Sequence, residues 1–307
     1  MSPTVHWRSL YPFESREISI VGHRMHYLDE GEGPVLLLLH GNPTWSFYWR
    51  EVVGAFRDRY RVVVPDHIGC GLSDKPRPRD GAWVYRLGGR VACIRELIEQ
   101  LDLQQVTLVA HDWGGAIGMG AAALAPERFE RFVFLNTATF RSSRCPVRIR
   151  LCRLPILGRL AVQGLNLFAR AALRMAVTDP RNLSPAVRAG LLAPYDNWRS
   201  RTAIYQFVRD IPLRASHPSY TPLKEIEGAL AQFRDHPVCL IWGMRDWCFT
   251  PAFLDRFLGF FPGAEVHRLA DAGHYVVEEA PRDVVRAIGA FLAAHPLAER
   301  PAPEGLS

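Results

Sequence analysis

The stretch VTLVAHDWGG at residues 106–115 constrains the fold more than any other part of the chain. Five apolar or small residues followed by a polar pair and two glycines predict a buried strand that turns sharply into a helix. Ala110 and Gly114 stand two residues to either side of Asp112, where a larger side chain would collide with the neighbouring strand or helix. The pattern therefore predicts a strained turn with Asp112 at its tip, and the first turn of the following helix favours a charged carboxylate there.

Similar short apolar runs recur along the chain and alternate with helical patterns, for example at 91–101 and 117–124, and with a last helix at 281–294. This alternation predicts an α/β fold with a mostly parallel eight-stranded sheet and helices on both faces. The first two expected strands form an antiparallel hairpin. The strands are expected at 17–21, 24–28, 35–39, 61–64, 106–110, 132–135, 238–242 and 264–269.

Residues 138–222 interrupt this rhythm, because they contain helical patterns rich in arginine and no clear strand. We interpret them as a helical cap inserted after the sixth strand, which leaves residues 1–137 and 223–307 as the catalytic core. The proline-rich tail at 296–307 is expected to be disordered.

Composition narrows the classes of function. The net charge is +6, but no block of basic residues with interleaved aromatics indicates nucleic-acid binding. The six cysteines form no C-x-x-C pair, so neither a metal site nor a disulfide framework is expected. We find no signal peptide and no run of eighteen apolar residues, and we therefore expect a cytoplasmic protein.

A histidine and a second carboxylate follow later strands in an order suited to catalysis. Asp246 comes directly after the expected strand at 238–242, and His274 comes after the last expected strand. This order of nucleophile, acid and histidine is typical of strand–turn–helix nucleophile sites. Asn136 occupies the alternative acid position and carries no charge. The sequence predicts a triad of Asp112, His274 and Asp246, which favours an enzyme over a receptor or scaffold.

A carboxylate nucleophile determines the chemistry that such a triad performs. Attack by Asp112 on an electrophilic carbon gives an ester to the enzyme, and His274 is expected to activate a water that attacks the Asp112 carbonyl. Backbone N–H groups of Trp113 and Asn42 are expected to stabilise the resulting oxyanion. No cofactor and no metal is required.

The motif HGNPT at 40–44, the pair Asp112-Trp113 and the run DHIGCGLSDKP at 66–76 resemble the haloalkane dehalogenases of the α/β-hydrolase fold. The resemblance covers nearly the whole expected core. It implies that the side chains of Asn42 and Trp113 bind the leaving group through their N–H groups. Epoxide hydrolases are an alternative, because they share the Asp-Trp pair and use two cap tyrosines as proton donors. Tyr195, Tyr205 and Tyr220 lie in the expected cap.

The acid after the seventh strand, together with Asn42 and Trp113, is similar to the third subfamily of haloalkane dehalogenase-like proteins. The segments 40–50 and 243–247 look like its β-lactone decarboxylases, which act in bacterial long-chain olefin biosynthesis. This resemblance implies conversion of a long-chain cis-β-lactone to an alkene and carbon dioxide. Haloalkane dehalogenase activity is the alternative, and the ring atom attacked stays open.

The expected cap has a dense set of apolar side chains laced with arginines. They suit a hydrophobic small-molecule substrate, or docking on a membrane surface or on other enzymes of the olefin pathway. An ordinary cap core with a solvated basic face explains the same pattern. The side chains are Ile149, Leu151, Leu154, Ile156, Leu157, Leu160, Ala161, Leu165, Leu167 and Phe168.

Overall fold

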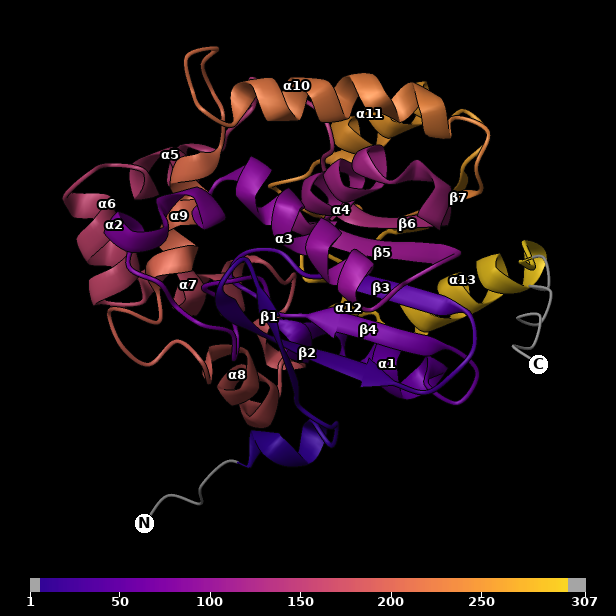
Figure 1. Cartoon of the computed structure of the whole chain (residues 1–307). Helices are drawn as coiled ribbons and strands as arrows, with labels where there is room; N and C mark the ends of the chain where they lie inside the picture. The colour runs from indigo at the N-terminus through magenta and orange to yellow at the C-terminus, as the bar shows by residue number, and fades with distance from the viewer. Residues whose placement is uncertain (1–5, 298–307) are drawn as a thin grey trace.

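An eight-stranded sheet forms the centre of the molecule in the computed structural model, which describes residues 6–297 (Figure 1). All eight expected strands are present, and their ends differ from the expected ones by a few residues. Most of the proline-rich tail lies outside the described residues. The strands are β1 (Arg16–Ile20), β2 (His23–Glu30), β3 (Val35–Leu39), β4 (Arg61–Pro65), β5 (Val106–Asp112), β6 (Phe129–Thr137), β7 (Val238–Gly243) and β8 (Glu265–Leu269).

The order of the strands places the ends of β3 and β5 at the functional edge of the sheet. The order is β1-β2-β4-β3-β5-β6-β7-β8, with β1, β2 and β4 paired antiparallel and the remaining pairs parallel. The chain moves outward from β3 to β4 and then crosses back to β5, so the direction of winding reverses between β3 and β5. Ligands of open α/β sheets bind at the carboxyl ends of strands at such a reversal.

Helices cover both faces of the sheet, and two apolar clusters hold them there. Side chains of β3 alternate between the clusters: Leu37 and Leu39 pack with α3, α4 and α11, whereas Leu36 and Leu38 pack with α1, α12 and α13. This burial on both faces explains why β3 reads as an uninterrupted apolar run. The core helices are α1 (Arg50–Phe56), α2 (Pro78–Gly81), α3 (Leu87–Gln100), α4 (Trp113–Leu124), α10 (Tyr220–Ala229), α11 (Pro251–Phe260), α12 (Val276–Glu279) and α13 (Pro281–Ala294).

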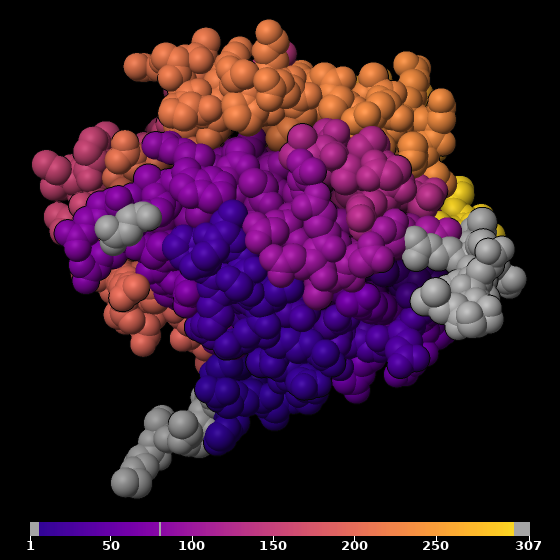
Figure 2. All heavy atoms as spheres, in the orientation of Figure 1, coloured from indigo at the N-terminus to yellow at the C-terminus, as the bar shows by residue number. Residues whose placement is uncertain are grey.

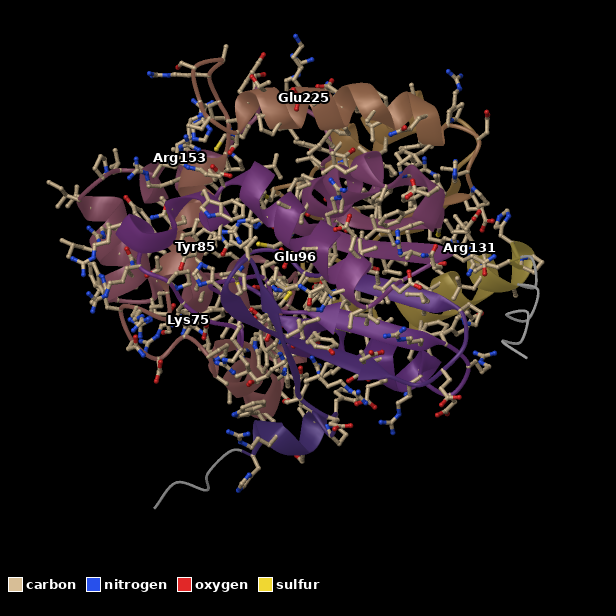
Figure 3. All side chains as sticks on the ribbon, viewed as in Figure 1. Lys75, Tyr85, Glu96, Arg131, Arg153 and Glu225 are labelled. Carbon is tan, nitrogen blue, oxygen red and sulfur yellow. The ribbon has the colours of Figure 1, made fainter. Side chains whose placement is uncertain are left out.

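Further helices between β6 and α10 gather at one end of the sheet (Figure 1), and they protrude at the left edge of the molecule in Figure 2. Arg153, labelled in Figure 3, donates hydrogen bonds to the carbonyls of Val208 and Ile211 and so ties the start of this region to its end. The helices are α5 (Val147–Cys152), α6 (Leu157–Arg159), the π-helix η5 (Leu160–Gly164), α7 (Leu167–Met175), α8 (Pro185–Leu192) and α9 (Thr202–Asp210).

The boundary expected at Pro222 falls inside α10, which begins at Tyr220 and packs on α3 and α4. Within residues 6–297 no helix is both long and apolar enough to cross a membrane. Short 3-10 helices link many of the elements. These 3-10 helices are η1 (Trp7–Leu10), η2 (Ser46–Trp49), η3 (Ala82–Tyr85), η4 (Pro126–Arg128), η6 (Pro180–Asn182) and η7 (Leu230–Phe233).

Candidate active site

Asp112 ends β5 and caps α4 in a strained turn. Its φ is 53° and its ψ is −127°, in a region that non-glycine residues seldom adopt. A Cβ at Gly114 would lie 2.2 Å from the Leu39 carbonyl oxygen, and one at Gly41 would lie 2.3 Å from the Asp112 side chain. Glycine is therefore required at both positions. The sequence pattern predicts the need for a small residue at Gly114. The need for glycine at position 41 depends on how closely the loop after β3 approaches Asp112, which the sequence does not show.

One carboxylate oxygen of Asp112 is held by two backbone N–H groups. Oδ1 accepts hydrogen bonds from the N–H of Trp113 and from the N–H of Asn42, the latter over 3.1 Å. These are the two donors that the sequence analysis names for an oxyanion site. The other oxygen, Oδ2, lies 3.3 Å from Nε2 of His274. The two oxygens therefore have different surroundings: Oδ1 is in place to carry a developing negative charge, and Oδ2 is left for attack.

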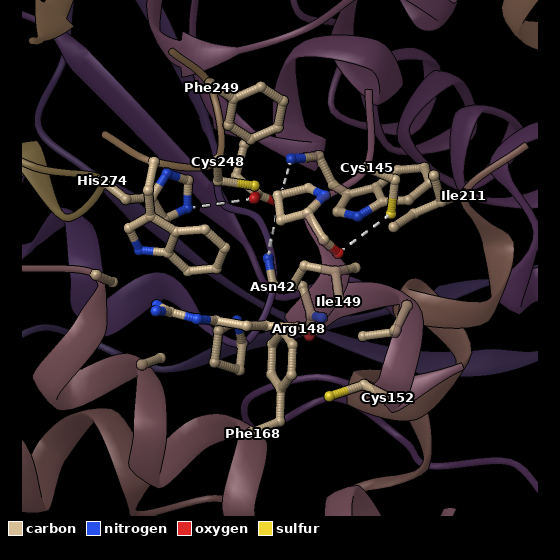
Figure 4. Close-up of a pocket in the computed structure, with 18 of the residues that line it drawn as sticks. Asn42, Cys145, Arg148, Ile149, Cys152, Phe168, Ile211, Cys248, Phe249 and His274 are labelled. Carbon is tan, nitrogen blue, oxygen red and sulfur yellow. Dashed lines mark hydrogen bonds and ion pairs between the residues drawn. The ribbon is translucent and has the colours of Figure 1, made fainter. Parts of the chain in front are cut away.

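His274 lies between two carboxylates. Its Nδ1 lies 2.8 Å from Oδ2 of Asp246, and its Nε2 faces Asp112. All three side chains are buried. The structure thus brings together Asp112, His274 and Asp246, the three residues of the predicted triad, each following the expected strand. Figure 4 shows His274 at the edge of the pocket.

Asn136 holds Asp246, a contact that the sequence analysis does not anticipate. Its Nδ2 donates to Oδ2 of Asp246 over 3.0 Å and to the carbonyl of Gly243, and its Oδ1 accepts from the Gly243 N–H over 2.7 Å. The Cys248 N–H donates to the other oxygen of Asp246. The signal for this role is the place of Asn136 near the end of β6, which pairs with β7, the strand that precedes Asp246.

Charge coupling shifts the pKa values of the buried pair in opposite directions. Burial favours a neutral imidazole, but the carboxylates of Asp246 and Asp112 outweigh it and raise the pKa of His274 to about 10. Burial also favours a neutral Asp112, yet the hydrogen bond and charge of His274 hold the pKa of Asp112 below its ordinary value. Asp112 and His274 therefore form an ion pair at neutral pH.

A largely apolar cavity of about 640 Å³ lies over these groups. Its lining includes Asn42, Asp112, Trp113 and His274 from the core (Figure 4). One N–H of the Asn42 side chain donates to the Ile204 carbonyl, and its Oδ1 is buried without a partner among the described residues. The Asn42 side-chain amide has a second N–H group besides the one bonded to Ile204. The cavity has the size of sites that enclose a drug-sized ligand.

The cap contributes apolar walls to the cavity rather than proton donors. Tyr195 donates its hydroxyl to the Thr44 carbonyl, and Tyr205 donates to backbone carbonyls of the cap. Neither lines the cavity, and Tyr220 does not line it either; among the described residues its lining includes a single tyrosine, Tyr275. The paired cap tyrosines that an epoxide hydrolase requires are therefore not in place. The apolar cap residues in the lining include Ile149, Leu151, Ala161, Leu167 and Phe168.

Hydrogen bonds join the end of α7 to the two loops that contain Asp246 and His274. The Tyr275 N–H donates to the Ala176 carbonyl over 2.7 Å, and the Trp247 indole N–H donates to the Met175 carbonyl. Tyr275 follows His274 and Trp247 follows Asp246. Two adjacent cap carbonyls thus position the neighbours of the histidine and of the acid.

Comparisons with known proteins agree with this geometry. The family model described as alpha/beta hydrolase fold matches residues 34–281. A cis-3-alkyl-4-alkyloxetan-2-one decarboxylase from Xanthomonas campestris is 40% identical over 94% of this chain and 98% of its own length. A decarboxylase of the same name from Shewanella oneidensis is 39% identical over 92% of this chain and 90% of its own length.

Haloalkane dehalogenases are similar as well. Haloalkane dehalogenase 2 from Mycobacterium bovis is 34% identical over 91% of this chain and 95% of its own length. The crystal structure of the haloalkane dehalogenase DatA from Agrobacterium tumefaciens superposes with a TM-score of 0.81 at 26% identity, covering 92% of this chain and 96% of that one. Both comparisons extend over the core and the cap together.

Proposed function

Because the chain belongs to the α/β-hydrolase-fold family, we propose that it converts long-chain cis-β-lactones to alkenes and carbon dioxide with Asp112 as the nucleophile. An oxetan-2-one is a four-membered β-lactone, so the two decarboxylases support this substrate class. The observation that carries the proposal is the different setting of the two Asp112 oxygens. Oδ1 is held by two backbone N–H groups, whereas Oδ2 has no backbone donor, faces Nε2 of His274 and lies beneath an apolar cavity.

The reaction balances in two steps without water. In the first step Oδ2 of Asp112 bonds to the alkyl-bearing ring carbon next to the lactone oxygen, and not to the carbonyl carbon. The bond between this alkyl-bearing carbon and the lactone oxygen breaks. Its electron pair stays on the departing oxygen as a carboxylate, which the side-chain N–H groups of Asn42 and Trp113 bind. In the second step this carboxylate leaves as carbon dioxide, the released pair forms the alkene, and the ester bond breaks to restore the Asp112 carboxylate.

His274 serves this route as a cation. Its pKa of about 10 keeps it protonated at neutral pH, 3.3 Å from Oδ2 of Asp112. Negative charge returns to Asp112 as the alkene forms, and the imidazolium stabilises that charge at the moment it develops. Asp246 keeps the proton on the imidazole and fixes the ring.

Haloalkane dehalogenation is the second candidate, and the dehalogenase relative and the same pair of N–H donors support it. There the departing group is a halide, and Asp112 must be freed by water that attacks its carbonyl. Ester formation removes the charge of Asp112 and so lowers the pKa of His274, which turns the imidazole into a base only at that stage.

The test offers the purified protein a cis-β-lactone with two long alkyl chains and, separately, a short haloalkane. We expect alkene formation, measured by gas chromatography, to be far faster than halide release, and Asp112→Asn to abolish both. Strong halide release without alkene would establish the dehalogenase alternative. No turnover of either substrate would refute both candidates.

Heavy-oxygen water separates the two chemical routes on one preparation. Decarboxylation by the route above leaves Asp112 without label, whereas hydrolysis of an Asp112 ester places a heavy oxygen in its carboxylate. Mass spectrometry of the peptide that contains Asp112, recovered after many turnovers of the lactone, reads the difference. A labelled Asp112 would show that the β-lactone also passes through a hydrolysed ester.

A further inference from the structure

We propose that the cap docks on the surface of an anionic phospholipid bilayer through an exposed apolar surface that surrounds an opening of the cavity. We call it the apolar cap surface. It lies on α5, α6, η5, α7 and the linkers between them, and successive helices of this set contact one another. Its members are Val147, Leu151, Leu154, Ile156, Leu157, Leu160, Leu165 and Leu167.

This surface concentrates the exposed apolar side chains of the molecule. Of the twelve large hydrophobic side chains that are exposed among residues 6–297, eight lie between Val147 and Leu167. Ile156 and Leu157 are the most exposed, at 73% and 71%. Contiguous exposed apolar surface of this kind marks a docking site on a soluble domain.

The charges around the surface select an anionic partner. Residues 131–178 contain nine arginines and no aspartate or glutamate. Arg148, Arg150, Arg159, Arg170 and Arg174 are exposed, and none of them forms an ion pair within the described residues. An anionic surface would satisfy these five guanidinium groups together.

The mixture of side chains favours lipid over an acidic protein. Trp198 is exposed beside η5, and the guanidinium of Arg159 lies 5.2 Å from the centroid of its ring. Tryptophan and arginine sit at the headgroup level of a bilayer, while leucine and isoleucine side chains enter the acyl region. The apolar cap surface and its rim therefore match the two layers of a membrane interface.

The same surface contains an opening of the cavity. Leu151 and Leu167 line the cavity and are also exposed, at 58% and 49%. A cavity whose lining residues reach the solvent opens beside them. Docking would place this opening against the bilayer, so that a water-insoluble substrate and its hydrocarbon product exchange with lipid instead of water.

Vesicle flotation tests the proposal without any substrate. We expect the full chain to float with vesicles of phosphatidylcholine mixed with phosphatidylglycerol, and less with phosphatidylcholine alone or at high salt. Ile156→Ser together with Leu157→Ser should weaken partitioning by about tenfold per side chain. Arg150→Gln together with Arg170→Gln should weaken it by about fivefold per charge.

Leu124→Ser is the matched control, because Leu124 is 52% exposed at the end of α4, outside the cap. It should float like the unaltered chain. Neither Ile156 nor Leu157 lines the cavity, so their double variant should turn over a short soluble substrate normally. Since flotation needs no turnover, its outcome is separate from that of the proposed reaction.

Three results would overturn the docking proposal. The first is an unaltered chain that stays with the buffer, and the second is a serine double variant that floats as well as the unaltered chain. The third is self-association, measured by light scattering, that the serine double variant abolishes while vesicle binding is absent. In that case a second copy of the chain, and not lipid, covers the surface.

Discussion

The floor of the cavity and the cap segment 147–167 above it differ in how their side chains are satisfied. The floor consists of Asn42, Asp112 and His274, with Asp246 and Asn136 behind His274. These residues are buried and polar, and each has a hydrogen-bond partner. The cap segment is apolar and largely exposed. The pre-organised polar groups of the floor determine the chemistry, whereas the apolar side chains of the cap determine which substrates reach it. Substitutions in the two regions should therefore fail in different ways.

Removal of the nucleophile should have the largest effect. Asp112→Asn keeps the shape of the side chain and cannot form the ester, so kcat should fall by roughly 10⁵-fold or more. Alkene formation followed by gas chromatography measures this, and circular dichroism checks the fold. A substantial remaining rate would mean that another group attacks the substrate.

Removal of the acid should have the next largest effect. Asp246→Asn preserves the hydrogen bond from Cys248 but takes away the negative charge that keeps His274 protonated and fixes its ring, so we expect a loss of about 10⁴-fold in kcat. Asp271→Asn is the matched control, because Asp271 is exposed and pairs only with Arg245 among the described residues. Near-normal activity of Asp246→Asn would assign the acid role elsewhere.

The buried ion pair also predicts how stability depends on pH. The pKa of His274 rises from an ordinary 6.5 to about 10 in the folded chain, so its contribution is fully present below pH 6.5 and is lost as the pH rises through 10. The pKa of Asp112 is lowered, so its contribution is lost on the acid side instead.

Chemical unfolding of the unaltered chain and of His274→Gln at a series of pH values measures this effect. The difference in unfolding constant between the two should change by up to about 1,000-fold between neutral and strongly alkaline pH. A difference that stays constant across this range would mean that His274 is neutral in the folded chain.

Asn136 should matter less than the charged groups. Asn136→Ala removes one hydrogen bond to Asp246 and leaves the buried Gly243 N–H without its acceptor. We expect kcat to fall by about tenfold with KM unchanged, and the unfolding free energy to fall by about 1–3 kcal/mol. A shift in the pH profile of kcat distinguishes positioning of the acid from a purely structural role, which would lower stability alone.

The floor could be predicted because its signals are local. The tight turn at Asp112 requires small neighbours, and the buried apolar strand β7 ends three residues before Asp246. The fold class and the family are confirmed, whereas the catalytic roles stay predictions. The role of the Asn136 amide is not predicted, because its partner Asp246 lies 110 residues away in the sequence, in the loop after β7.

The cap could be predicted only as helical. The sequence predicts that its apolar residues line a channel, form a docking surface or build an ordinary cap core. The structure places some of them in the cavity lining and leaves others exposed. Ile149 and Phe168 line the cavity, whereas Ile156, Leu157 and Leu165 are exposed. Short helices joined by a π-helix do not keep one periodicity, so spacing alone does not tell which side faces inward.

The narrowest expected effect, limited to long-chain substrates, tests that division within the cap. Ile149→Trp places a larger ring in the cavity wall, so we expect kcat/KM for a lactone with long alkyl chains to fall by about tenfold while a short-chain lactone is unaffected. Ile156→Trp, on the same segment but exposed, should change neither value when the substrate is dispersed in detergent. Equal losses in both variants, measured by alkene formation, would mean that the cap acts as one unit and that its inner and outer residues are not distinct.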